Sequence, residues 1–440
     1  MNTTETPTSP SPSPHPGEKL PVRALIASLA GTAIEWYDFF LYGIAAALVF
    51  SKIFFPTGMD PFIALLLSYA TFGIPFFIRP LGGLVFSHIG DRIGRKKTLI
   101  YTLMLMGIAT VLIGLLPGYE TIGIAAPILL TLLRVVQGIG IGGEWGGAVL
   151  LAVEYSSNRR RGFFGSVPQM GVPLGLLLGT LAMTLVSLMP EKLFLSWGWR
   201  IPFILSFVLV VVGLWIRKGI DETPAFQKNL KQGNISRVPL LDTFRHHWKS
   251  VLLSTGMKVV ETAPFYIFST YIISYATAEQ GYSNSIVLNA ITLATFVSCL
   301  MIPLMGILSD RIGRKPVYIG GTVGIILVAF PYFYLVETKS TLLFTLGSVL
   351  ALGIIWSAVT GVLGTLYSEV FSTRVRYTGV TLGYQLGAAL AGGTAPMIAA
   401  ALVRQAGGVW TPLAFYLIIT GAISLLSIWV IKETRGSELT

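Results

Sequence analysis

The chain has 440 residues, of which 53% are hydrophobic and only 12% charged, and its 31 lysines and arginines exceed its 20 acidic residues to give a net charge of +11. A soluble protein of this composition would expose far more apolar surface than it could bury, so the ordinary soluble classes are excluded. The basic residues are spread over separate short segments and form no groove, so we expect contact with anionic membrane lipids and no nucleic-acid partner.

Residues 1–22 carry a Pro-Ser pattern and no apolar run, so we expect a disordered cytoplasmic tail rather than a signal peptide. The rest of the chain alternates between clusters of charge and apolar runs of about 20 residues, the length that crosses a hydrocarbon core of ~30 Å as a helix. The sequence therefore predicts an all-α membrane protein. Its twelve transmembrane helices cover approximately residues 23–50, 62–89, 98–117, 122–152, 163–188, 199–216, 250–276, 286–308, 316–335, 341–366, 377–403 and 411–431.

Two motifs occur twice in the chain, in the same order and separated each time by about half its length. Residues 90–97 read GDRIGRKK, and residues 309–315 read SDRIGRK. Deeper in each half, the pattern E-x-x-S-x-R-x-R begins at Glu154 and again at Glu369. Two motifs repeated in register indicate a duplicated chain.

The duplication predicts two pseudo-symmetric six-helix halves, residues 23–217 and 250–432. A cytoplasmic linker, 218–249, joins them, and a cytoplasmic tail, 433–440, follows the second. Short basic loops stay on the cytoplasmic side of a membrane. With the N-terminus inside, 23 of the 31 lysines and arginines fall in cytoplasmic segments. We therefore expect both termini in the cytoplasm and the chain in a bacterial inner membrane.

The repeated basic loop fits the pattern G-x-x-x-D-[RK]-x-G-[RK]-[RK], in which glycine permits a tight turn and the basic residues hold the loop inside. The second copy matches from Gly306 to Lys315, whereas the first copy has Ser87 at the leading position. This pattern is the signature of the major facilitator superfamily, which the sequence therefore resembles. The resemblance implies that superfamily's fold, with two six-helix halves around a central site.

Longer motifs resemble one family within that superfamily. The first helix contains GTAIEWYDFFLYG at 31–43, the second ends with RPLGG at 79–83, and the fourth contains R-x-x-Q-G-x-G-x-G-G-E-W-G-G at 134–147. With WGWRIPF at 197–203 and ETP at 222–224, they are similar to the metabolite:proton symporters, whose members carry shikimate, 2-oxoglutarate, citrate, betaine or proline. The resemblance covers nearly the whole chain and implies uptake of a small metabolite with protons.

Several charged residues stand inside the apolar runs, where a charge costs at least ~2.5–3.5 kcal/mol. Glu35 and Asp38 are three residues apart on one helix and so share a face, as do Lys258 and Glu261 on another. Such groups are expected to pair and to face a wet central cavity. Acids in a cavity that opens and closes can take up and release protons, so we predict proton coupling at Glu35, Asp38 and Glu144.

An arginine in the same layer can bind a substrate carboxylate through two parallel hydrogen bonds. Arg79 is the main candidate, because the following Pro80 permits its helix to bend toward the cavity. For Arg134 and Glu144, a structural ion pair within a glycine-rich helix is an open alternative. The predicted substrate-binding residues come from both halves and are Tyr37, Tyr42, Arg79, Arg134, Gln169, Lys258, Glu261, Tyr266, Tyr384 and Gln385.

The repeated motifs lie at matching cytoplasmic ends of the two halves and combine acids with arginines. We expect charge-assisted contacts among them to close the cytoplasmic side when the central cavity faces outward. The predicted gate residues are Asp91, Arg92, Arg95, Glu154, Arg159, Arg161, Asp310, Arg311, Arg314, Glu369, Arg374 and Arg376.

Other chemistry is not indicated by the sequence. The G-x-G-x-x-G match at 138–143 lies in an apolar helix and is interpreted as close helix packing rather than a dinucleotide site. We expect no cofactor and no metal, because the chain has one cysteine and no G-x-x-x-x-G-K-[ST] motif for ATP. We also expect no enzymatic activity, because none of the four histidines falls in the central layer.

The sequence thus predicts a transporter that takes up a small organic acid or zwitterion, shikimate-like or a dicarboxylate, together with protons and by alternating access. A proton-coupled drug or metabolite efflux antiporter is the alternative, and a channel is a more distant one. The expected partners are the metabolite, protons and membrane lipids, and we expect the chain to work as a monomer.

Overall fold

The computed structural model describes residues 22–93, 95–142, 149, 152–153, 156, 159–218, 247–371 and 376–436. Within these ranges it describes no side chain of residues 22–28, 84, 87–93, 95–99, 216–218 and 376–378. The predicted tails and most of the predicted linker, as well as Glu144 and Glu154, lie outside the described residues.

Helices make up the N-terminal half. They are α1 (Val22–Ala45) with the π-helical turn η1 (Ala46–Phe50) and α2 (Ser51–Ile53), α3 (Pro61–Ile93), α4 (Arg95–Leu115), α5 (Tyr119–Ile122), α6 (Ala125–Ile141), α8 (Arg161–Ser166) with η2 (Pro168–Met170) and α9 (Gly171–Ser187), and α10 (Glu191–Leu193) with η3 (Phe194–Gly198) and α11 (Arg200–Lys218).

The C-terminal half is built in the same way. Its helices are α14 (Trp248–Tyr266) with η4 (Ile267–Tyr271), α15 (Ile272–Ser274) and η5 (Tyr275–Glu279), α16 (Asn284–Ile312), α17 (Arg314–Glu337), α18 (Thr341–Ser348) with η6 (Val349–Ile355) and α19 (Trp356–Val370), α20 (Arg376–Gly387) with η7 (Ala388–Gly392) and α21 (Ala395–Gln405), and α22 (Thr411–Val430).

The predicted membrane helices are confirmed, since each of the twelve apolar runs overlaps one of these helical stretches. Among the described residues, eight stretches are long and apolar enough to cross a membrane, and a ninth consists of Glu191–Gly198 and Arg200–Trp215, bent by 41°. Two more are the shorter apolar helices at Ile100–Leu115 and Ala125–Ile141. The remaining stretch begins with α14, which carries two of the charged residues predicted to face a cavity.

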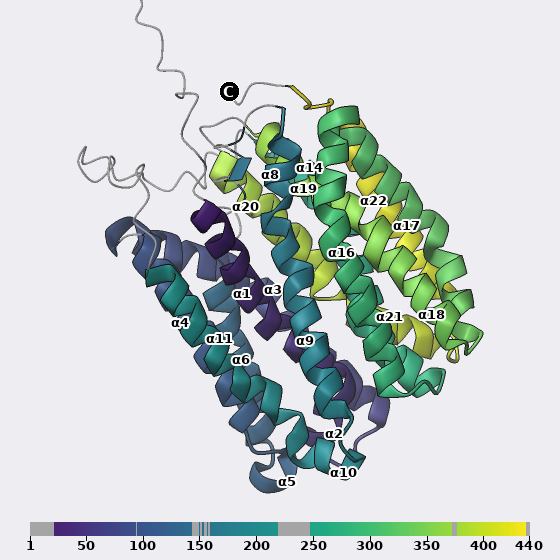
Figure 1. Ribbon diagram of the computed structural model, residues 1–440. Coiled ribbons are helices and arrows are strands. Elements are labelled where there is room, and N and C mark those ends of the chain that lie inside the picture. The colour runs from purple at the N-terminus through teal and green to yellow at the C-terminus, as the bar shows by residue number, and fades with distance from the viewer. Residues whose placement is uncertain are drawn as a thin grey trace, which may run out of the picture.

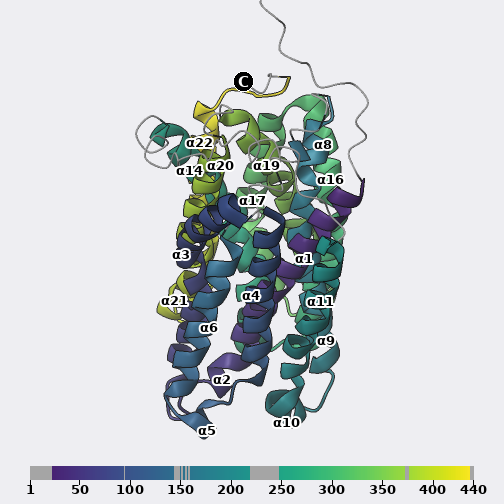
Figure 2. The same cartoon turned by 90° about the vertical axis from the view of Figure 1, so that its left-hand side faces the viewer.

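The two halves stand side by side along one long axis. Figure 1 shows the N-terminal half in purple to teal beside the C-terminal half in green to yellow, with α9 next to α16 where the halves meet. In the view turned by 90°, the long helices again lie roughly along one common axis (Figure 2). Within the halves, α1 packs on α9, α3 on α6 and α4 on α11, while α14 packs on both α20 and α22.

Glycines bring α3 and α6 into backbone contact, and this contact places the charged residues of both helices. A Cβ atom on Gly138 would come within 2.8 Å of the Cα atom of Pro75, and one on Gly142 would overlap the carbonyl oxygen of Arg79. The glycine-rich stretch of α6 therefore serves close helix packing where it is described. Pro75 and Pro80 both lie inside α3, so two backbone carbonyls of that helix lose their N–H partner.

Candidate substrate and proton site

A small cavity lies between the two halves. Its volume is about 20 Å³, measured for the centres of water molecules, which is room for one or two waters. Both halves contribute to its wall. The lining residues are Trp36, Phe76, Arg79, Val172, Lys258, Glu261, Thr262, Phe265, Tyr266, Trp356, Tyr384 and Ala388.

Aromatic rings surround the guanidinium group of Arg79 in this wall. Its guanidinium carbon lies 4.5 Å from the ring centre of Phe76, 4.6 Å from that of Phe39 and 5.2 Å from that of Trp36. Its side chain is 1% exposed, yet the Nε and Nη2 atoms have no hydrogen-bond partner among the described residues. Glu35, one helical turn from Phe39 on α1, interacts with Arg79 electrostatically. The geometry leaves two donor nitrogen atoms of Arg79, Nε and Nη2, for a ligand.

The second buried cation, Lys258, belongs to the C-terminal half and is already paired. It forms an ion pair with Glu261 and lies 3.7 Å from the ring centre of Tyr384. The hydroxyl groups of Thr360 and Thr262 donate to the two carboxylate oxygens of Glu261, at 2.7 and 2.9 Å. Glu261 is thus fully hydrogen-bonded, whereas Lys258 has a third N–H donor that can reach a ligand in the cavity.

Asp38 lies on α1 close to this cavity but does not line it. Ser206 on α11 donates a hydrogen bond to its Oδ1 atom, and its Oδ2 atom has no partner among the described residues. The residue is 1% exposed, and within the described chain no arginine or lysine forms a salt bridge with it. An isolated carboxylate is costly to bury as an anion, so binding of a proton relieves that cost.

Arg134, in contrast, uses its donors within the N-terminal half. Its Nη1 atom donates to Gln137 Oε1 at 2.6 Å, its Nη2 atom to the Phe72 carbonyl at 3.0 Å, and its Nε atom to the Thr71 carbonyl at 3.4 Å. The Thr71 carbonyl stands four residues before Pro75 and has therefore lost its helical partner. Arg134 replaces that partner. The geometry favours the structural one of the two roles that the sequence left open for Arg134.

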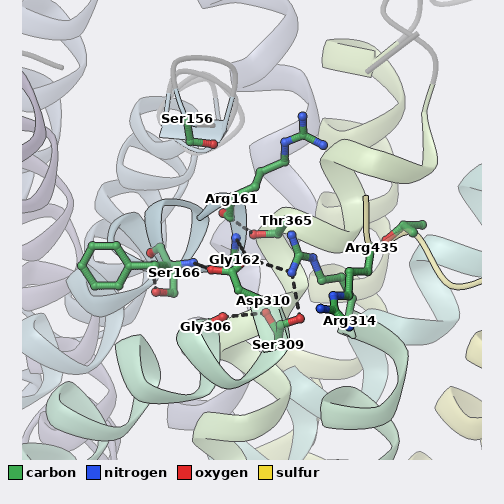
Figure 3. A network of polar contacts seen from close by, with 12 residues as sticks. Ser156, Arg161, Gly162, Ser166, Gly306, Ser309, Asp310, Arg314, Thr365 and Arg435 are labelled. Atoms are coloured by element: carbon green, nitrogen blue, oxygen red, sulfur yellow. Dashed lines mark hydrogen bonds and ion pairs between the residues drawn. The ribbon is translucent and has the colours of Figure 1, made fainter. Parts of the chain in front are cut away.

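On one side of the cavity, the two halves are joined by two hydrogen bonds to an acidic side chain and by one close contact at a glycine. The Oδ1 and Oδ2 atoms of Asp310 on α16 accept hydrogen bonds from the backbone N–H groups of Gly162 and Phe163 at the start of α8, at 2.8 and 3.0 Å (Figure 3). A Cβ atom on Gly162 would lie 2.6 Å from the Gly306 carbonyl oxygen. A carboxylate at a helix N-terminus is favourable, and here it reaches across the interface. We call this interface the gate contact.

Glu369 on α19 completes the gate contact. Its carboxylate is 3.4 Å from Arg161 of the N-terminal half and 3.3 Å from Arg314 of its own half. Arg314 also donates to Asp310 at 2.8 Å. Arg314 thus connects the two acids that face the N-terminal half, and all four side chains belong to the predicted gate.

The residues after α22 hold the start of α17 and, with it, Arg314. The carboxylate of Glu433 accepts hydrogen bonds from the backbone N–H groups of Arg314 and Lys315, both at 2.9 Å. Gly313 has φ +110°, and a Cβ atom there would lie 2.7 Å from the carboxylate of Glu433. Both the backbone conformation and the lack of space therefore require glycine at this position of the basic motif. Thr434 Oγ1 donates to Glu369 at 2.6 Å. Glu433 and Thr434 are residues of the gate contact that the sequence analysis missed.

The halves also meet on the opposite side of the cavity. The hydroxyl groups of Tyr69 on α3 and Ser274 on α15 are 2.6 Å apart. A Cβ atom on Gly73 would lie 2.5 Å from the Gly393 carbonyl oxygen, so α3 and the segment after η7 touch through their backbones. The described parts of the two halves therefore contact each other on both sides of the cavity.

Comparison with known proteins identifies this architecture. A family model described as the Major Facilitator Superfamily matches residues 28–393. The chain belongs to this superfamily. It is 41% identical over 416 residues to the shikimate transporter of Escherichia coli (strain K12), with 94% of this chain and 95% of that protein covered. It is 37% identical over 428 residues to the proline/betaine transporter of the same organism, covering 95% and 84%.

A solved structure shows the same fold. The xylose transporter XylE from E. coli, in a partially occluded inward-open conformation, superposes with a TM-score of 0.73 at 16% identity, covering 95% of this chain and 99% of that one. The predicted fold, two six-helix halves of a major facilitator, is thereby confirmed. The relatives also confirm the resemblance to metabolite symporters, and this chain is a major facilitator transporter.

The predicted substrate-binding residues of this transporter divide into two groups. Those that line the cavity are Arg79, Lys258, Glu261, Tyr266 and Tyr384. Of the others, Tyr37 donates to the Pro202 carbonyl, Tyr42 pairs with Thr71, Gln169 donates to the Thr360 carbonyl in the other half, and Gln385 is buried near the cavity. For both groups and for Glu35, a role in transport stays a prediction.

The predicted gate residues also divide. The structure brings together Arg161, Asp310, Arg314 and Glu369, while Arg159 and Arg311 are exposed at the surface. The side chains of the remaining predicted gate residues, which lie mainly in the first copies of the two motifs, are outside the described residues. They are Asp91, Arg92, Arg95, Glu154, Arg374 and Arg376.

Replacing Asp310 by asparagine should shift the transporter toward the state that is open at the gate contact. The amide keeps one acceptor but loses the charge and the acceptor for the Phe163 N–H group. Loss of charge-assisted hydrogen bonds of about 1.5–3 kcal/mol corresponds to a shift of roughly ten- to a hundredfold.

This shift can be measured by thiol labelling at Ser166→Cys, because Ser166 on α8 is buried in the gate contact. The native Cys299 on α16 is also buried and lies away from this contact. Labelling should become faster in the Asp310→Asn protein. The matched control is Arg311→Gln at the exposed neighbouring position. Equal labelling rates in both proteins would show that Asp310 does not hold the halves together.

Proposed function

We propose that this protein is a proton-coupled uptake transporter for a small organic acid. The proposal rests on Arg79, a fully buried guanidinium at the interface of the halves. No described residue accepts a hydrogen bond from its Nε or Nη2 atom. Buried donors without a partner are rare, because each one costs free energy. A carboxylate fits the planar fork of such an arginine, because its two oxygen atoms can accept two parallel hydrogen bonds.

A carboxylate between the halves also explains how binding would close the protein around it. Arg79 comes from α3 of the N-terminal half and Lys258 from α14 of the C-terminal half, and the two cations line the same cavity. Each cation already has an acid near it, Glu261 beside Lys258 and Glu35 near Arg79. A carboxylate bound between the halves would add hydrogen bonds from both cations, so it would favour an arrangement closed on both sides over either open one.

Proton coupling is assigned to Asp38 on the same helix that carries the aromatic contacts of Arg79. Phe39, the next residue, lies 4.6 Å from the guanidinium of Arg79 and 5.0 Å from that of Arg134. A proton on Asp38 changes its hydrogen bond with Ser206 and so changes how α1 sits on α11. The proton would bind while the cavity faces outward and leave when it faces inward, and the position of Phe39 would transmit its presence to Arg79.

The proposed orientation has both termini in the cytoplasm of a bacterial inner membrane, with the gate contact on the cytoplasmic side. One chain contains both halves of the cavity, so a monomer suffices for transport. Two relatives are named as a shikimate transporter and a proline/betaine transporter. Shikimate, proline and betaine all contain a carboxyl group. This common feature supports an acid or zwitterion as the substrate of this chain.

The experiment uses purified protein in liposomes with a pH gradient, acidic outside. We expect labelled shikimate to accumulate inside and the accumulation to collapse when a protonophore removes the gradient. Uptake that does not respond to the gradient would contradict proton coupling. A thermal-shift screen with organic acids and betaines runs in parallel, because any specific ligand stabilises the folded protein. Failure of every carboxylate in that screen would contradict the substrate class.

A further inference from the structure

Four polar side chains between the cavity and the gate contact have a buried oxygen atom without a hydrogen-bond partner in the described chain. They are Ser254 and Thr255 on α14 and Thr381 and Gln385 on α20. Ser254, Thr255 and Gln385 are 0%, 8% and 5% exposed. Buried polar atoms in native proteins nearly always form a hydrogen bond, so a group of four without one marks a place where water or a ligand binds.

Helical spacing shows that three of these residues continue the wall of the cavity. Thr262 and Ala388 both line it. Thr255 stands seven residues before Thr262, two turns earlier on the same face of α14. Gln385 and Thr381 stand three and seven residues before Ala388 and hence on the same face of α20. Both helices begin at the gate side, so these residues extend the cavity wall toward the gate contact.

The two polar stripes lie next to each other, because glycines of α20 touch α14. A Cβ atom on Gly383 would lie 2.5 Å from that of Ser254, and one on Gly387 would lie 2.8 Å from the Thr255 carbonyl oxygen. The hydroxyl group of Tyr367 donates to the Ser254 carbonyl, and Tyr367 precedes Glu369 of the gate contact by two residues on α19. The group therefore lies between the cavity and the gate contact.

We propose that Ser254, Thr255, Thr381 and Gln385 form a second binding site, a release site, for a substrate that carries hydroxyl groups in addition to its carboxylate. Hydroxyl groups of serine and threonine can donate to a carboxylate. The Oε1 atom of Gln385 can only accept, so the ligand must bring an O–H or N–H donor. A fully N-methylated betaine has none. This inference rests on the proposed function and narrows its substrate class to hydroxylated acids.

The release site gives the substrate a route from the cavity to the side of the gate contact. When that contact opens, the carboxylate leaves Arg79 and meets the hydroxyl groups of α14, while a ligand hydroxyl meets Gln385. Each step exchanges one set of hydrogen bonds for another, so no polar group crosses the apolar layer without a partner. Substitution here should slow release and leave binding in the cavity unchanged.

The test compares Thr255→Val and Gln385→Met with Thr292→Val. The control residue also has a buried hydroxyl without a partner, but it lies in the third of α16 farthest from the gate contact. The affinity for shikimate, measured by thermal shift, should change less than about threefold in all three proteins. Exchange of labelled shikimate across the liposome membrane should be at least about tenfold slower in the two release-site variants, because each variant removes one hydrogen bond to the moving ligand. Exchange should be normal in the control.

Wild-type protein should also exchange labelled shikimate at least about tenfold faster than labelled glycine betaine, because betaine has no donor for Gln385. Normal exchange in both release-site variants would overturn the proposal. A parallel loss of affinity and exchange would overturn it as well, because the residues would then belong to the cavity itself. Exchange of glycine betaine as fast as that of shikimate would overturn the need for a donor while leaving the carboxylate function intact. No binding of either compound or of any other carboxylate would overturn the proposed function and this inference together.

Discussion

Replacing Arg79 by lysine is expected to lower the affinity for a carboxylate substrate by roughly 30- to 1000-fold, the equivalent of ~2–4 kcal/mol. The charge is kept, but one ammonium group cannot reproduce the two parallel hydrogen bonds of a guanidinium. The shorter, rounder head group also stacks less well on Phe39 and Phe76, whose ring centres lie 4.6 and 4.5 Å from the guanidinium carbon of Arg79. Both losses weaken the bound state.

Binding of shikimate to purified wild-type and Arg79→Lys protein, measured by thermal shift, tests this expectation directly. Arg134→Lys is the matched control, because the donors of Arg134 already reach Gln137 and two backbone carbonyls. That variant should lose thermal stability and keep its ligand affinity. If Arg79→Lys instead binds and transports normally, Arg79 is structural, and Lys258 becomes the candidate anchor.

The twelve helices could be predicted because a bilayer imposes a length and a composition on every segment that crosses it. The central charges could be found for the same reason, since a charge in such a segment requires an explanation. Helical spacing then placed Lys258 and Glu261 on one face, and the structure pairs them at the cavity. These inferences depend only on position along a single helix.

Inferences that depend on the partner of a side chain were harder to make. The sequence offers Arg134 as a cation like Arg79, and only the contact of α6 with α3 reveals that a carbonyl freed by Pro75 accepts from it. Phe265 of the cavity wall could have been predicted, because it follows the predicted residues Lys258 and Glu261 at helical spacing on α14. No such spacing marks Trp356 on α19.

At the gate contact, too, the partners of a side chain were harder to predict than its position. The repeated acidic and basic motifs correctly indicated that Asp310, Arg314 and Glu369 lie together. The groups that Asp310 reaches across the interface are backbone N–H groups, which every residue has and which no sequence pattern singles out. The role of Glu433 could have been suspected, because Glu433-Thr434 repeats Glu222-Thr223 at the end of the other half.

Replacing Asp38 by asparagine should abolish uphill accumulation of substrate and preserve exchange of labelled substrate across the membrane. Asparagine has nearly the shape of aspartate and can still accept the hydrogen bond of Ser206, so α1 should keep its place on α11. It cannot bind or release a proton at neutral pH. The transporter would then change state with or without a proton gradient, as exchange requires, and the gradient could no longer drive net transport.

The size of the effect follows from the gradient itself. If one proton accompanies each substrate, one pH unit supports a concentration ratio of about ten, since each unit is worth about 1.36 kcal/mol. In the Asp38→Asn protein this ratio should fall to about one while exchange stays within a few-fold of normal. Glu35→Gln is the matched comparison, because Glu35 shares the helix face but interacts with Arg79. If both variants accumulate substrate as fully as the wild-type protein, neither acid carries the proton, and the coupling group must lie elsewhere in the membrane.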